Sequence, residues 1–91
     1  MFVSDMKNKM VYSKDMVNLG KVKDVEFDAS EMKVTNMIVE FRKEAAKELL
    51  NKKIVLRHAQ GRVPVASIES IKDALNLKLP RKELKGAFEG L

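Results

Sequence analysis

The segment LGKVKDVEFDASEMKVTNMIVEF, residues 19–41, is the feature that most constrains how this chain can fold. Two runs of alternating apolar residues flank a turn-forming stretch, which predicts an antiparallel hairpin. In the first run, strict alternation puts Val22 on one face and Val25 and Phe27 on the other. A strand that changes face needs one extra residue, so we predict a β-bulge between Val22 and Val25, with Gly20 allowing close backbone approach beside it. Bulges of this kind accompany the strong coiling that closes a small sheet into a barrel.

Short strands and helical turns are predicted along the rest of the chain. Apolar alternation indicates strands over 9–12, 19–28, 33–41, 52–58, 62–66 and 75–80. Helical spacing predicts helices over 42–50 and 67–75, the second with Ser67 as its N-cap. Gly61 is expected at positive φ in a turn, and Pro64 at a strand end or sheet edge, because proline lacks an N–H donor. The fold class is therefore mainly β: a small, mostly antiparallel β-barrel of about six strands with short helical insertions.

Length and composition narrow the class of protein further. Ninety-one residues fit one domain, and the absence of cysteine excludes disulfides and thiolate metal sites. No apolar run approaches the roughly 20 residues of a membrane span, and residues 1–10 are too polar for a signal-peptide core. We therefore expect a cytoplasmic protein without an integral membrane segment, which reaches a membrane only through a partner.

The net charge of +5 resides in the second half of the chain. Residues 1–50 hold nine Lys/Arg and nine Asp/Glu, whereas residues 51–91 hold nine and four. A basic half is typical of a surface that meets nucleic acid, an anionic membrane or an acidic protein, and equally of a solvated face that only aids solubility. The candidate cations for a polyanion or partner are Lys52, Lys53, Arg57, Arg62, Lys78, Arg81, Lys82 and Lys85. Aromatic platforms for bases are scarce, because Phe27 and Phe41 are expected in the core.

Candidate catalytic groups are few. His58 is the only histidine, and Asp24, Glu26 and Asp28 are the carboxylates that could join it. Two carboxylates two residues apart on an exposed strand are far more often solvent-facing charge than an acid–base pair. We therefore expect no enzyme activity, no metal and no cofactor. Asp24 is instead predicted to brace the bulge by accepting hydrogen bonds from freed backbone N–H groups.

The segment 81–91 places Leu84, Phe88 and Leu91 on one helical stripe. An apolar stripe at the end of a domain docks on its own domain or on a partner, and the remaining possibility is a frayed tail. The stripe is therefore a candidate apolar interface. The segment is predicted as a helical or flexible tail that follows a barrel domain of residues 1–80.

Three stretches of the sequence resemble the PRC-barrel family: MVY (10–12), LGKVKDVEFD (19–28) with the strand that follows it, and VPVASIESI (63–71). In this order and spacing they extend over most of the chain, which is similar to stand-alone short archaeal-type members. The resemblance implies a PRC-type β-barrel.

Two turns depart from the family pattern. The first hairpin turn, SKDMVN (13–18), has no glycine, and Met32 stands where a glycine tends to precede the strand at 34–41. These turns are either wider, or rotated, or they hold a non-glycine residue at positive φ at some energetic cost.

The resemblance also implies a function. The family consists of binding or adaptor modules that have no shared catalytic residues, and the resemblance therefore implies a binding function. Related archaeal barrels look like partners of the membrane-tethered protein that anchors the division ring, and they tend to self-associate. Others form the C-terminus of small-subunit ribosome maturation factors and bind a ribosomal protein. The expectation is a non-enzymatic, homodimeric adaptor in archaeal-type cell division or membrane-linked assembly; the alternative is a ribosome- or RNA-associated factor.

Overall fold

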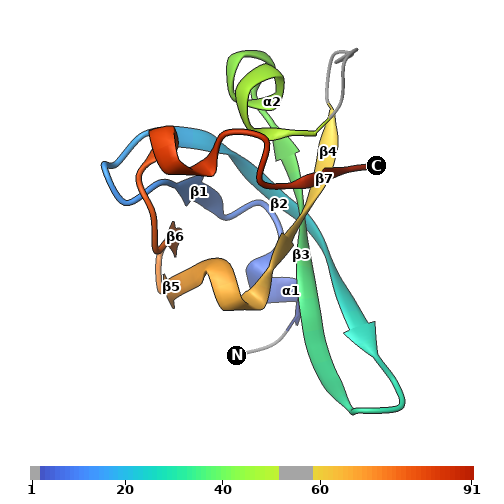
Figure 1. Cartoon of the computed structure of the whole chain (residues 1–91). Helices are drawn as coiled ribbons and strands as arrows, with labels where there is room; N and C mark the ends of the chain where they lie inside the picture. The colour runs from blue at the N-terminus through green and yellow to red at the C-terminus, as the bar shows by residue number, and fades with distance from the viewer. Residues whose placement is uncertain (1–2, 52–58) are drawn as a thin grey trace.

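The computed structural model describes residues 3–51 and 59–91 of the chain (Figure 1). In chain order the elements are α1 (Val3–Met6), β1 (Met10–Tyr12), β2 (Asn18–Asp28), β3 (Lys33–Phe41), α2 (Lys43–Leu49), β4 (Gln60–Pro64), η1 (Val65–Ser67), β5 (Ile68–Ile71), β6 (Leu75–Leu77), η2 (Arg81–Leu84) and β7 (Glu89–Gly90). The chain is mainly β, as its sequence predicts. The strand predicted over 52–58, which includes His58, lies outside the described residues.

The seven strands form one curled sheet in the order β5-β6-β1-β2-β3-β4-β7. Neighbouring strands run antiparallel except β1 and β6, which run parallel. This confirms the expected small, mostly antiparallel architecture. Within the two described ranges, none of the helices has the length and apolar character needed to cross a membrane.

The β2–β3 hairpin is the longest part of the sheet, and its turn end projects away from the rest of the molecule (Figure 1). A register shift between Val22 and Asp24 leaves Lys23 as the extra residue of a β-bulge. This is where the change of parity predicts a bulge, and it returns Val25 to the face that packs against the core.

Two glycines are required by packing. A Cβ on Gly20 would lie 2.1 Å from the carbonyl oxygen of Glu40, so β2 and β3 approach too closely there for any side chain. Gly61 lies inside β4 rather than in a turn, and its φ is not positive, which corrects the prediction. A Cβ on Gly61 would lie 2.4 Å from Cδ2 of Leu50, so this glycine makes room for a core side chain. Pro64 is the last residue of β4.

The two turns without the expected glycines contain methionines at positive φ. Met16 has φ of 64° and Met32 has φ of 54°. Of the three possibilities for these turns, the chain uses the one in which a non-glycine residue adopts the left-handed conformation. Both side chains are exposed.

Helix α2 lies within the predicted helical range 42–50, and its Ala45, Ala46 and Leu49 are buried. The helix predicted over 67–75 is wrong, because the chain forms the short turn η1 and then the strand β5. A register shift in β5 between Ile68 and Ser70 explains the error. The shift adds one residue, so apolar side chains three positions apart pack against the same core, as they would on a helix.

The C-terminal segment belongs to the barrel, which corrects the expectation of a separate tail after residue 80. Leu84 is 3% exposed and Phe88 is 1% exposed, both in the main core. η2 and β7 replace a terminal helix, and β7 pairs with β4. The stripe therefore docks on its own domain, and of its three residues only Leu91 is exposed.

Candidate interaction surface

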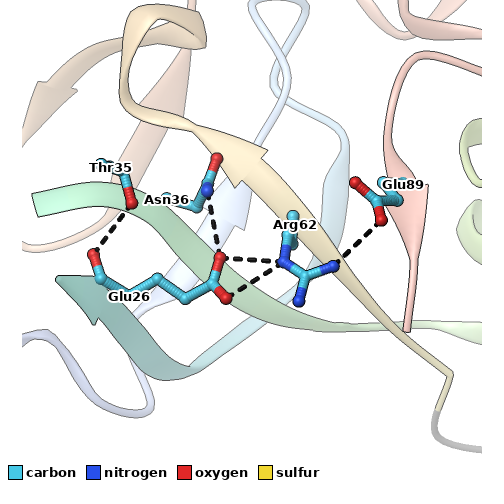
Figure 2. A network of polar contacts seen from close by, with 5 residues as sticks. All are labelled: Glu26, Thr35, Asn36, Arg62 and Glu89. Atoms are coloured by element: carbon cyan, nitrogen blue, oxygen red, sulfur yellow. Dashed lines mark hydrogen bonds and ion pairs between the residues drawn. The ribbon is translucent and has the colours of Figure 1, made fainter. Parts of the chain in front are cut away.

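A polar network crosses four strands on the sheet face that points away from the core (Figure 2). Arg62 on β4 donates through Nε to Glu26 Oε1 at 2.9 Å and Oε2 at 3.1 Å, and through Nη1 to Glu89 Oε1 at 3.1 Å. Asn36 Nδ2 donates to Glu26 Oε1 at 3.0 Å, and Thr35 Oγ1 donates to the Glu26 carbonyl oxygen at 3.4 Å. The network thus joins β2, β3, β4 and β7.

This network is a brace between strands. The side chains of Arg62 and Glu26 are 34% and 35% exposed, so solvent screens their attraction strongly. The single Nε–H of Arg62 is shared between both oxygens of Glu26, while Nη1 of the same guanidinium donates to Glu89, so the arginine links two carboxylates on different strands. Arg62 was predicted as a cation for a polyanion, but its guanidinium is already shared between Glu26 and Glu89. Asn36 and Glu89 were not predicted from the sequence, because no local pattern pairs them with residues so distant along the chain.

Asp24 lies beside the bulge. Its Oδ1 accepts a hydrogen bond from the backbone N–H of Val25 at 2.8 Å, and its side chain is exposed. A shallow depression of about 480 Å³ next to it is lined in part by Ile38 and Leu91. Ile38 is only 8% exposed although it lies outside the main core cluster, so β3 is covered on both faces at this point. Asp24 therefore closes a backbone hydrogen bond at the edge of a partly apolar hollow.

A groove of about 480 Å³ opens between the β1–β3 part of the sheet and the start of α2. Met10, 43% exposed, provides an apolar wall. Lys21 and Glu40, which form an ion pair at 3.8 Å, lie on its polar side with Arg42. Met10 was not predicted as a surface residue, because one methionine in a short strand gives no alternation from which to assign its face.

Asp15 ties the turn between β1 and β2 to η2. It accepts hydrogen bonds from the Ser13 hydroxyl and from the backbone N–H of Arg81, the latter at 3.1 Å. The Ser13 hydroxyl, followed by the Arg81 N–H, holds the pKa of Asp15 below its ordinary value of 3.8. Asp28, the last residue of β2, is similar, since hydrogen bonds from Ser30 and then Glu31 in the following turn lower its pKa. Both carboxylates brace turns.

The predicted basic set divides into three groups. Lys52, Lys53 and Arg57 lie outside the described residues. Arg62 and Arg81 face carboxylates, since Arg81 Nε lies 3.6 Å from Glu48 Oε1. Lys78, Lys82 and Lys85 are exposed. Within the described part of this predicted set, these three are thus the solvent-facing cations.

Two of the exposed large apolar side chains lie on the projecting hairpin, Phe27 and Met32. Phe27 is 57% exposed, which corrects the prediction that it lies in the core; Phe41, at 2%, is buried as predicted. The physical reason is that Phe27 belongs to the part of β2 beyond its pairing with β1. Met32, in the hairpin turn, is 75% exposed.

Comparison with known families agrees with this architecture. Residues 1–84 match the PRC-barrel domain. With a curled, mainly β sheet whose central hairpin carries the predicted bulge, the chain belongs to the PRC-barrel domain family. No curated protein matches the chain.

Proposed function

We propose that this PRC-barrel is a non-enzymatic, self-associating adaptor that binds a protein partner in archaeal-type cell division or membrane-linked assembly. Family membership supports a binding module, and the observation that carries the proposal is the exposure of Phe27 on the projecting hairpin. Aromatic and methionine side chains are enriched in protein interfaces, and Met32 lies on the same arm. The adaptor works in the cytoplasm, and its partner recruits it to the membrane.

The experiment is affinity capture from cell extract with the tagged full chain, followed by mass spectrometry and a native mass measurement. Wild type is expected to be a dimer and to retain a protein partner. Phe27→Ser should lose the partner, whereas Leu79→Ser, which alters another exposed apolar residue (44% exposed), should keep it. A strict monomer that captures no protein would overturn the proposal.

A ribosome- or RNA-associated function is the second candidate, and the exposed Lys78, Lys82 and Lys85 favour it. Binding that depends on phosphate contacts weakens steeply as salt rises. The test is binding of the full chain to small ribosomal subunits or RNA at low and high salt. The variant Lys82→Glu/Lys85→Glu should bind less, and Lys33→Glu on the distant hairpin should not. An absence of binding even at low salt would rule this function out.

A further inference from the structure

Among the residues that the structure describes, strand β2 has a free edge beyond its bulge. The N–H of Val22 donates to the Lys9 carbonyl oxygen at 2.9 Å, and its carbonyl oxygen accepts from the Asn8 N–H at 2.7 Å. Farther along β2, residues 3–51 and 59–91 provide no strand on that side, while β3 pairs along the other. A free edge of this kind is a template for the addition of another strand.

The backbone groups at this edge can be assigned. Val22 presents its N–H and carbonyl to the β1 side, and the extra residue Lys23 shifts the alternation by one. Val25 and Phe27 therefore present their N–H and carbonyl groups to the free edge. The Val25 N–H is held by the carboxylate of Asp24, the residue before it. One edge donor is thus capped by a side chain that can be displaced.

The side chains of this edge have opposite character on the two faces of the sheet. On the core side, Val25 is half-buried and Phe27 is 57% exposed. Alternation places three carboxylates on the other side: Asp24, Glu26 and Asp28. Glu26 is already paired with Arg62, and Asp28 accepts hydrogen bonds in the turn, so Asp24 is the carboxylate best placed to meet an added strand. An added strand that matches both faces would carry apolar residues on one side and basic residues on the other.

We propose that the free edge of β2, from Asp24 to Asp28, receives an extended polypeptide segment in which basic and apolar residues alternate. The incoming strand takes over the Val25 N–H, and the released Asp24 carboxylate faces its basic side chains. This inference rests on the proposed protein-binding function and names the chemistry of the partner. A second copy of β2 fits less well, because self-pairing would set two acidic rows side by side.

The test follows amide hydrogen exchange by NMR in the full chain with added peptide. The acetylated peptide KVKIKVK should slow exchange at Val25 and Phe27 by about tenfold or more, because the Phe27 amide gains a backbone partner and the Val25 amide exchanges its exposed carboxylate cap for a bond in a strand ladder. The peptide EVEIEVE, with the same apolar residues and reversed charge, should not. Asp24→Asn removes the charge but keeps a carbonyl cap for Val25, and it should weaken binding of the basic peptide about threefold to tenfold. Asp73→Asn, at an exposed site outside this strand, should leave binding unchanged.

Three results would overturn the inference: equal binding of both peptides, protection at other amides only, or no protection at millimolar peptide. Slowing of the same amides with rising protein concentration, without peptide, would assign the edge to a second copy and would also overturn it. If captured partner protein leaves Val25 and Phe27 exchanging freely, this inference fails while the proposed function stands. If no partner is captured at all, the proposed function itself fails.

Discussion

The ring of Phe88 stacks on the ring of Phe41, with centroids 5.8 Å apart and an interplanar angle of 19°. Phe41 ends β3, and Phe88 directly precedes β7, so this contact joins the central hairpin to the C-terminal segment. The N–H of Phe88 also donates to the Leu49 carbonyl oxygen at 3.1 Å. The last strand is therefore held by the core as well as by its edge pairing.

Phe88→Ala is expected to lower the free energy of unfolding by about 3–5 kcal/mol, because it removes a fully buried ring and leaves a cavity. A loss of this size is a large share of the stability of a small domain. Urea denaturation measures it, with Phe27→Ala as the exposed counterpart, expected to cost below about 1 kcal/mol. Similar losses from both variants would contradict the burial of Phe88.

Met32→Gly is expected to raise the free energy of unfolding by about 0.5–1 kcal/mol. The methionine occupies a left-handed conformation that glycine adopts without a Cβ clash, and the gain is reduced by glycine's greater freedom in the unfolded chain. The midpoint of urea denaturation gives the change. Met32→Ala keeps the Cβ and removes the exposed thioether, so it should show no comparable gain; equal gains would point to the side chain and not the backbone.

The Arg62–Glu26 pair should show a measurable coupling energy of about 0.5–1 kcal/mol, since Nε lies 2.9 Å from Glu26 Oε1 but the two side chains are one-third exposed. A double-mutant cycle with Arg62→Gln and Glu26→Gln measures it by chemical denaturation. The Lys33–Glu31 pair, 3.3 Å apart but 63% and 56% exposed, is the control and should couple by less than about 0.3 kcal/mol. High salt should reduce the first coupling; insensitivity to salt would argue against an electrostatic brace.

Acid should destabilise the fold partly through Asp15. Its folded-state pKa lies below the ordinary value of 3.8 because the Ser13 hydroxyl, and then the Arg81 N–H, stabilise the carboxylate. The unfolded chain therefore binds a proton first, so this contribution is complete above about pH 4 and is lost as pH falls through the folded-state pKa.

Urea denaturation at several pH values below 6 checks this dependence. Asp15→Asn should show a shallower loss of stability on acidification than wild type. Ser13→Ala, which keeps the carboxyl but removes its strongest donor, should also be shallower. A decline as steep as that of wild type in both variants would refute the assignment.

The bulge in β2 was predictable because a change of parity within one strand has a single simple cause. The same device in β5 misled the sequence analysis, since residues three apart, Ile68 and Ile71, match a helix as well as a bulged strand. The spacing of apolar residues alone does not show that an extra residue has been inserted into a strand. The length of apolar runs did not resolve the ambiguity, because both elements are short.

The candidate surface was less predictable than the fold. Phe27 is an aromatic residue of the kind that usually lies in a core. It is exposed because β1 pairs with β2 only as far as Lys21, and Phe27 lies in the part of the hairpin beyond that pairing. The Arg62 network joins residues from four strands, and such distant pairs leave no local pattern. Phe88 shows the opposite outcome. The sequence left open whether its apolar stripe docks on its own domain or on a partner, and in the structure Phe88 is buried in the core of its own domain.

The parallel pairing of β1 with β6, Val11 beside Leu75 and Tyr12 beside Asn76, has a kinetic consequence. These two three-residue strands are separated along the chain by the whole of β2 to β5. Closing so long a loop loses entropy before any contact compensates for it, so formation of this pair should come late and limit the folding rate. The first strand of the chain therefore gains its second neighbour only when β6, near the end of the chain, pairs with it.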